Sequence, residues 1–232
     1  MTAIQPIDKK LHKNIKIKTN DLSTTADQHI VPLVIHEFPI ASSQFPIIFI
    51  KDKTGEIRQS AALLGLRPNQ NLFWKNKQWD ATYIPAALRA QPFSLMSLDN
   101  TATTIAVCLD NDSPLINEDE GNPLFEDNNE QTTFLKKSSQ FVTTLVQQNN
   151  VTKSFITDIE KLDLFVQQEL SIKDVNDQSH KMTGIYRIDE SRFNALSNDE
   201  FLELRKKGYL TPIYAHLSSL LQLHSLGKRS AS

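Results

Sequence analysis

The sequence is poor in glycine and cysteine, and this scarcity argues against several kinds of site. Only six glycines occur in 232 residues, and none belongs to a G-x-G-x-x-G or G-x-x-x-x-G-K-[S/T] pattern, whose backbone amides hold phosphate groups. A nucleotide site on a glycine-rich loop is therefore not expected. The single cysteine, Cys108, cannot form an internal disulfide. Its apolar neighbours in TTIAVCLD predict a buried strand thiol of low reactivity.

Neither a strong charge excess nor a long apolar run is present. The net charge is -2, which gives no strong field for nucleic acid or anionic lipid, so no nucleic-acid partner is expected. No stretch approaches the roughly 18 apolar residues of a membrane span. The first residues lack the apolar run and small-residue cleavage site of a signal peptide. We therefore expect a cytoplasmic protein without a transmembrane segment.

Strand patterns dominate the first half of the chain. Runs of β-branched and aromatic residues predict strands at residues 45–50, 57–64, 71–73, 79–83 and 103–110. The first two should form a hairpin around Gly55. The acidic, turn-rich stretch 116–131 is expected to be a loop anchored by Leu124 and Phe125.

Helical spacing of apolar residues begins near residue 132. Helices are predicted at residues 132–150, 152–170, 198–207 and 212–226, and a strand pair at 171–175 and 184–189. Thr152 is a candidate N-cap. Ser197 and Glu200 form a capping box, and Gly208 ends the same helix.

The predicted fold class is α+β, a strand-rich N-terminal half with an antiparallel or mixed sheet packed with C-terminal helices. Residues 1–28 are predicted to be a flexible arm. Residues 29–228 are predicted to form one domain, strand-rich over 29–131 and helix-rich over 132–228.

The usual catalytic and metal-binding patterns are missing. The six histidines include no H-x-H and no H-E-x-x-H pair, and no serine lies in a G-x-S-x-G turn. His216 and His224 are eight residues apart, about 12 Å of helical rise, which is too far for one metal ion. No catalytic residue, metal or cofactor is predicted.

The stretch NLFWKNKQWDATYIPAALRAQPF, residues 71–93, holds both tryptophans. Trp79 and Tyr83 are four residues apart and share a face in either a helix or a strand. Packing in the interior is the simpler interpretation, and a binding surface is the alternative. Arg67 and Arg89 each need a partner, which can be a carboxylate such as Glu37, a backbone carbonyl or an acidic ligand.

Several segments together resemble the SapC family of bacterial proteins. They are VPLVIHEFPIASSQFPIIFIKD, ALLGLRPNQNLFW, WDATYIPAALRAQPFSL, GNPLFEDNNEQT and SNDEFLELRKKGYLTPIYAHLSSL, in family order from about residue 30 to 225. The family name refers to a paracrystalline surface layer, and relatives accompany TonB-dependent receptors. The resemblance thus implies a setting in nutrient uptake or the surface layer, without established catalytic residues. The family's basic and aromatic pair before PF is replaced here by Ala90 and Gln91, which weakens an anion site at Arg89.

Three functional hypotheses follow from these observations. The first is a non-catalytic interaction or ligand-binding module with a protein or small-ligand partner, and its candidate binding residues are Glu37, His36, Arg67, Trp79, Tyr83 and Arg89. The second is an enzyme, or an enzyme accessory, that acts on a small acidic or peptide substrate and has Glu37, His36 and Arg89 in a cleft. The third is a surface-layer component, which would need export.

Overall fold

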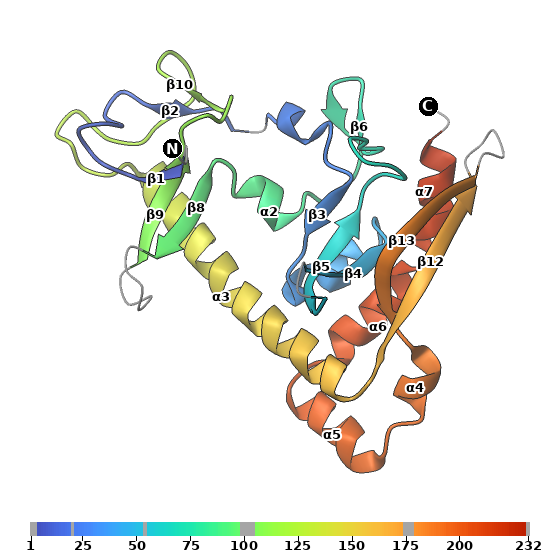
Figure 1. The fold of residues 1–232 in the computed structure, drawn as a ribbon. Coiled ribbons are helices and arrows are strands. Elements are labelled where there is room, and N and C mark those ends of the chain that lie inside the picture. The colour runs from blue at the N-terminus through green and yellow to red at the C-terminus, as the bar shows by residue number, and fades with distance from the viewer. Residues whose placement is uncertain (1–3, 20, 53–54, 98–104, 174–178, 231–232) are drawn as a thin grey trace. The chain divides into compact units, whose positions relative to one another are not determined.

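The chain forms two compact units that share one long helix. The computed structural model describes residues 4–19, 21–52, 55–97, 105–173 and 179–230. Unit 1 is Met1–Thr24 with Ala87–Gln147, and unit 2 is Thr25–Ala86 with Gln148–Ser232. Helix α3 (Thr133–Lys161) contributes its first half to unit 1 and its second half to unit 2 (Figure 1). These boundaries do not follow the predicted divisions, and the single domain over residues 29–228 stays a prediction.

Unit 1 contains two small antiparallel sheets. In the first, β9 (Ile105–Asp110) lies between β1 (Ile4–Pro6) and β8 (Phe93–Ser97); in the second, β2 (Lys16–Ile17) lies between β10 (Ile116–Asn117) and β11 (Asn122–Pro123). Strands β1 and β2 fall inside the range predicted as an N-terminal arm. The weak local pattern there does not prevent pairing, because both strands are completed by hydrogen bonds to residues about a hundred positions away.

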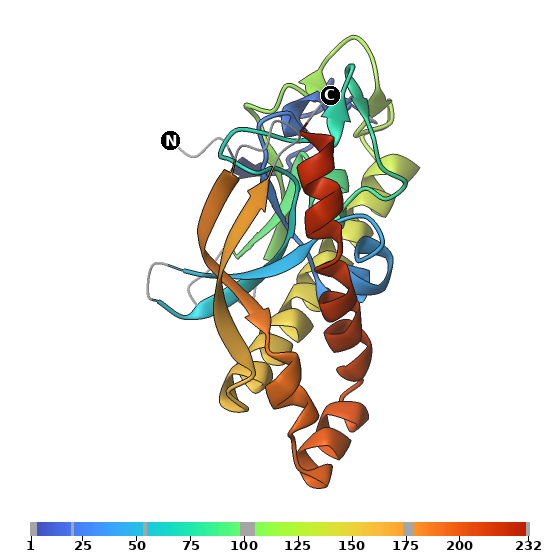
Figure 2. The ribbon, with the colours of Figure 1, turned by 90° about the vertical axis from the view of Figure 1, so that its right-hand side faces the viewer.

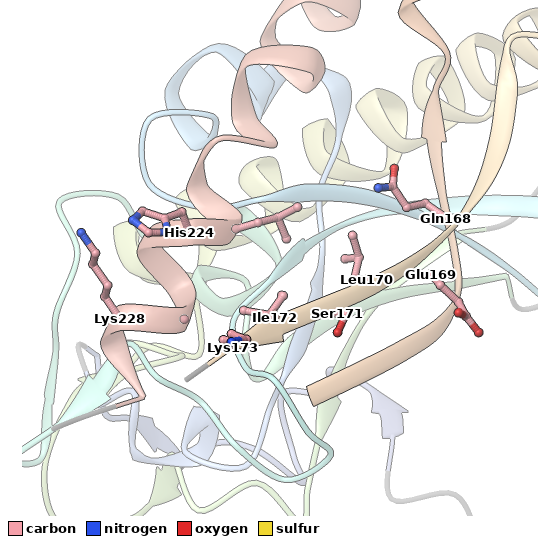
Figure 3. A pocket seen from close by; sticks show the side chains of 10 residues that line it. Gln168, Glu169, Leu170, Ser171, Ile172, Lys173, His224 and Lys228 are labelled. Atoms are coloured by element: carbon pink, nitrogen blue, oxygen red, sulfur yellow. The ribbon is translucent and has the colours of Figure 1, made fainter. Parts of the chain in front are cut away.

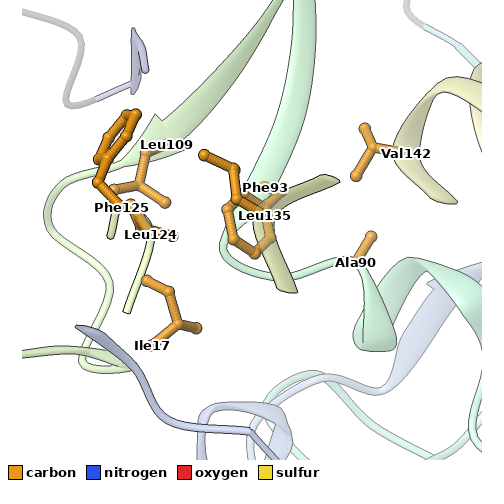
Figure 4. Close-up of a cluster of buried hydrophobic side chains, with 8 residues drawn as sticks. All are labelled: Ile17, Ala90, Phe93, Leu109, Leu124, Phe125, Leu135 and Val142. Atoms are coloured by element: carbon orange, nitrogen blue, oxygen red, sulfur yellow. The ribbon is translucent and has the colours of Figure 1, made fainter. Parts of the chain in front are cut away.

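An apolar cluster joins the strands of unit 1 to the first turns of α3 (Figure 4). Its buried members are Ile17, Ala90, Phe93, Leu109, Leu124, Phe125, Leu135 and Val142. The predicted anchors of the acidic loop are confirmed, since Leu124 is fully buried and Phe125 is 8% exposed. Cys108 is buried on β9 as expected, and burial raises the pKa of its thiol.

Unit 2 is built on a five-stranded antiparallel sheet. The strand order is β12 (Phe165–Lys173), β13 (Ser179–Ile188), β4 (Ile47–Lys51), β5 (Ile57–Leu63) and β3 (Ile30–Pro32). The predicted hairpin of residues 45–64 is confirmed as β4 and β5. Two very short strands, β6 (Trp74–Lys75) and β7 (Gln78–Trp79), form a second hairpin whose turn residues Asn76 and Lys77 have positive φ angles.

Strands β12 and β13 form a long twisted hairpin that extends beyond the rest of the sheet (Figure 2). Only Ile185 and Tyr186 of β13 pair with β4, so the outer half of the hairpin has no further strand beside it among the described residues. The register shifts opposite Gln168 and Leu170, where Gly184 takes a φ of +75°. This bulge increases the local twist of the hairpin.

Helix α6 (Leu210–Ser219) contacts β13 and β4 of this sheet, and α7 (Gln222–Arg229) contacts β12. Unit 2 also contains α1 (Phe38–Ala41), α4 (Glu190–Asn194), α5 (Asn198–Lys206) and the 3-10 turn η2 (Ile35–Glu37), whereas the 3-10 turn η1 (Ser23–Thr25) crosses the boundary between the units in sequence. Helix α2 (Ala86–Arg89) begins where the units meet in sequence. The capping box of Ser197 and Glu200 is confirmed at α5, and Gly208 follows that helix with a φ of +74°.

Three helical predictions are wrong in their extent. Residues 133–161 form one helix, because the sequence around Thr152 offers no break. The Thr152 hydroxyl donates to the carbonyl of Gln148 inside α3 instead of capping a new helix. The helix ends before Asp163, whose φ is +53°, and residues 165–173 are strand β12. The predicted last helix is divided into α6 and α7 at Leu220 and Leu221.

The predicted α+β class is confirmed: every strand pair that the structure describes is antiparallel, most of these strands lie in the first half of the chain, and the longer helices lie in the second. Residues 53–54, 103–104 and 174–175, which belong to predicted elements, lie outside the described residues. Within the described part of the chain, no helix is both long and apolar enough to cross a bilayer.

Candidate functional site

The aromatic stretch that begins at Asn71 packs mainly into unit 2. The Phe73 ring is 1% exposed and lies 4.7 Å from the ring of Phe45. The indole of Trp79 stacks on Phe73 at 6.1 Å and is half-buried. The guanidinium of Arg229 also lies over Phe73, at 4.3 Å from the ring centre, and pairs with Asp80. Interior packing, the simpler interpretation from the sequence, is therefore confirmed for Phe73, whereas Trp79 is only half-buried.

Glu37 lies at the centre of a hydrogen-bond network in unit 2. Its side chain is buried, and Oε1 accepts from the hydroxyl of Tyr83 at 2.7 Å and from the backbone N–H of Ala86 at 2.7 Å. Its Oε2 accepts from the backbone N–H of Val34 at 3.0 Å. The indole N–H of Trp79 donates to the carbonyl of Tyr83 at 2.9 Å, which connects the aromatic cluster to the same network.

The structure therefore brings three of the six predicted binding residues together: Glu37, Trp79 and Tyr83. Their polar atoms donate to or accept from other groups of the protein, so this cluster holds the 71–86 segment on the rest of unit 2. His36 is exposed in the turn that contains Glu37, and Arg67 is exposed after β5.

Arg89 belongs to the other unit. Its side chain is exposed, and its guanidinium lies 5.0 Å from the ring centre of Phe141 on the unit 1 half of α3. This is a cation–π contact, a kind of partner that a sequence cannot identify. A recognition role for these six residues stays a prediction.

A groove that the sequence does not predict runs between strand β12 and helix α7 (Figure 3). Its volume is about 720 Å³. It is lined by Gln168, Glu169, Leu170, Ser171, Ile172, Lys173, Leu223, His224, Gly227 and Lys228. The lining includes six consecutive residues of β12, although neighbouring side chains of a strand point to opposite faces. The groove therefore follows the length of the strand and is not confined to one of its faces.

The groove combines an apolar wall with a mainly basic rim. Leu170 and Ile172 are 6% and 8% exposed, and in Figure 3 they project to one side of β12 while Glu169 projects to the other. Lys173, His224 and Lys228 are exposed. Such a lining suits an occupant with apolar side chains and at least one carboxylate.

Gly227 sets how closely α7 approaches the strand. It is buried, and a Cβ at this position would lie 2.6 Å from the backbone oxygen of Lys173 and 3.0 Å from a methyl carbon of Ile172. No other residue fits there without moving the helix. Glycine at this position therefore allows α7 to lie directly against β12, and the helix forms one wall of the groove.

The titratable side chains that the structure describes can be compared with the requirements of a metal site. No cluster of three or more His, Cys, Asp or Glu side chains suited to a metal ion occurs among residues that the structure describes. Of the two histidines near the C-terminal end, His216 on α6 is fully buried and His224 on α7 is exposed. A smaller hollow of about 310 Å³ lies between α3 and α5, where the Lys207 ammonium pairs with Asp158 at 2.8 Å.

The sequence did not predict the groove, because residues 165–170 were predicted to be the end of a helix. The alternation of exposed and buried residues in ELSIK, with Leu170 and Ile172 inside, is the signal that indicates a strand with one covered face. The contribution of α7 could not be read from the sequence, since Gly227 looks like an ordinary helix terminator.

Comparison with known proteins gives one match. Neither a curated protein nor a solved structure matches the chain. A family model described as SapC matches residues 7–226, which is nearly the whole chain. The resemblance of the separate motifs thus extends over both units, and the chain belongs to the SapC family.

Proposed function

We propose that this SapC protein is a non-catalytic interaction module that binds an extended polypeptide segment along β12. The observation that carries the proposal is the position of β12. It is the last strand of its sheet, paired only with β13 among the described residues, and the groove beside α7 follows six of its residues.

The physical basis is strand addition. The outer edge of a strand carries backbone N–H and C=O groups that another extended chain can pair with, and pockets for alternate side chains supply selectivity. Leu170 and Ile172 line the groove on the α7 side, where they are almost fully buried, and Lys173 carries a cation on the other face. The helix leaves room beside the strand, because the groove holds about 720 Å³.

Photocrosslinking in the native cell tests this function. A photoreactive phenylalanine replaces His224, an exposed residue of the groove, and in a matched control it replaces Ser154, an exposed residue of α3 in the same unit. Irradiation should give a covalent adduct to a polypeptide from position 224 and little from position 154. Equal adduct yields from the two positions, or none from 224, would overturn the proposal.

Other expectations are part of the same proposal. We propose a cytoplasmic location, which fractionation of the native cell would check; recovery of the protein outside the inner membrane would contradict it. We keep Arg67, His36 and Arg89 as candidate recognition residues, because their side chains are exposed. Support for a link to TonB-dependent uptake or to a surface layer comes only from the family's genomic setting.

A further inference from the structure

We infer that the segment bound along β12 is residues 169–173 of a second copy of this chain, so that two protomers join their sheets edge to edge. This inference rests on the proposed strand addition and names its partner. The argument starts from the sequence of the outer strand, Glu169-Leu170-Ser171-Ile172-Lys173.

This five-residue segment is complementary to itself in the antiparallel direction. If Ser171 lies opposite Ser171 of the other copy, each Glu169 lies opposite a Lys173 and each Leu170 opposite an Ile172. Two ion pairs and two apolar pairs form at once, and such cross-strand pairs are the stabilising units of an antiparallel sheet. A twofold axis at Ser171 relates the two strands, which is the closed symmetry expected of a dimer.

The faces of the strand agree with this arrangement. A twofold axis perpendicular to the sheet keeps the α7 side of one copy on the α7 side of the other. The Leu170–Ile172 pairs would then lie on the side where both residues are already covered, next to the groove. The Glu169–Lys173 pairs would lie on the opposite side, where both residues are exposed to solvent. No charge is buried by the association, so no large desolvation cost opposes it.

Two other strand edges of this sheet, the outer part of β13 and the far edge of β3, are poorer candidates. The outer part of β13 carries Lys181 in the middle of Ser179–Thr183, and antiparallel self-pairing there would place Lys181 opposite Lys181. At the far edge of the sheet, β3 has three residues and ends in Pro32, which has no N–H to donate. Charged residues on an edge usually prevent pairing, but on β12 the two charges neutralise each other.

The association should be weak. Five paired residues cover less than the roughly 800 Å² per partner of a standard interface, and we expect a dissociation constant on the order of 10–1,000 µM. Sedimentation velocity of the full-length protein at increasing concentration, up to about 1 mM, should show a monomer that converts to a dimer. A monomer throughout this range would overturn the inference.

Charge reversal separates self-association from other causes. In Lys173→Glu, each Glu169 faces a second carboxylate, and dimerisation should fall at least about tenfold, as expected for two lost ion pairs and two new repulsions. Glu169→Lys should act in the same way. The double variant Glu169→Lys/Lys173→Glu restores both pairs in reversed order, so it should dimerise like the natural sequence. A double variant as weak as the single ones would contradict the proposed register.

A cysteine at the symmetry axis tests the register directly. In Ser171→Cys, the two thiols of a dimer lie opposite each other, with Cβ atoms about 4.5–5.5 Å apart, and oxidised glutathione should link them rapidly. Ser154→Cys is the control, and the natural Cys108 is buried. Equal linking rates in the two variants would refute the twofold pairing.

The results also distinguish the inference from the proposed function. Adducts from position 224 to a different polypeptide, with no Ser171→Cys dimer, would keep strand addition and remove the second copy as its partner. A lack of adducts together with a monomeric protein would remove both.

Discussion

At the scale of single residues, Glu37 shows how a carboxylate can be buried in the protein. Three donors surround it: the Tyr83 hydroxyl and the backbone N–H groups of Ala86 and Val34, at 2.7, 2.7 and 3.0 Å. Hydrogen bonds to a charged acceptor are stronger than neutral ones. They join η2 to a segment almost fifty residues later in the chain, and the carboxylate therefore organises the loop that carries Trp79.

Replacing this carboxylate should destabilise unit 2. In Glu37→Gln, the new amide NH2 group faces a donor instead of accepting from it, and we expect a loss of about 2–3 kcal/mol in the free energy of unfolding. Tyr83→Phe removes one hydrogen bond and should lose about 1 kcal/mol. The double variant should lose less free energy of unfolding than the sum of the two single losses, since both substitutions remove the same hydrogen bond. Urea unfolding of all four proteins measures this coupling.

His36→Ala is the matched control for these variants. His36 precedes Glu37 in the same turn but is exposed, so its removal should change the free energy of unfolding by less than about 0.5 kcal/mol. Additive losses from Glu37→Gln and Tyr83→Phe would show that the hydrogen bond between them contributes nothing to stability.

The sequence indicated some of these residues as important but did not predict their structural roles. It singled out Glu37, Trp79 and Tyr83 as members of a recognition site, because buried and exposed polar residues look alike in a sequence. What joins them is a contact between residues 37 and 83, and no local pattern encodes it. The ring of Phe141, which contacts Arg89, is also far from it in sequence.

At the scale of elements, local patterns predicted whether a segment is a helix or a strand better than they predicted the residues at which it begins and ends. The β4–β5 hairpin and helix α5 follow from turn and capping residues that act within a few positions. The end of α3 does not, because Asp163 leaves the helix through a left-handed conformation that aspartate adopts more readily than most residues. No proline or glycine lies there, and the apolar residues of 155–166 keep a helical spacing. The sequence therefore predicted a helix across residues that form the start of strand β12.

The contact between α7 and β12 gives a test at this scale. In Gly227→Ala, the new methyl group would lie 2.6 Å from the backbone oxygen of Lys173, so the helix must shift. We expect a loss of about 1–3 kcal/mol in the free energy of unfolding, despite the gain of up to about 1 kcal/mol that alanine brings to a helix. Thermal and urea unfolding would measure the net change.

Ser225→Ala on the same helix is the control. Ser225 is exposed and should show only the small helical gain of alanine. If Gly227→Ala were as stable as Ser225→Ala, close packing of α7 on the strand would not be what selects glycine at this position, and the wall of the groove would have to be explained differently.

At the scale of the whole molecule, the composition and the order of patterns were enough for the fold class. Strand signals in the first half and helix signals in the second predict α+β, and this is what the chain forms. The division into two units could not be predicted in the same way. Each unit combines an N-terminal segment with one from further along the chain, and α3 belongs to both. Such a division depends on contacts between distant segments, which a pattern along the chain does not contain.

Stability as a function of pH is a property of the whole folded chain, and His216 should dominate it just below neutrality. Its ring is fully buried beside Phe49, at 5.0 Å between ring centres, and its Nε2 accepts from the backbone N–H of Ile188. Burial lowers the pKa of His216 from 6.5 to about 3, and the charge of Arg187 adds to this effect, although a backbone contact with Ile47 opposes it. The folded protein therefore keeps this histidine neutral where the unfolded chain protonates it.

The direction of the effect follows from proton counting. Between pH 6.5 and about 3 the unfolded chain binds one more proton at this histidine than the folded protein does, so stability falls as the pH falls, by about 1.4 kcal/mol per pH unit. From pH 7 to pH 5 the loss should be about 2 kcal/mol. In His216→Gln, whose side-chain oxygen can accept the same N–H, this part of the pH dependence should disappear, whereas His224→Gln at an exposed position should keep it. Urea unfolding at pH 7, 6 and 5 measures all three proteins, and equal slopes for natural and His216→Gln protein would show that another group takes up the proton.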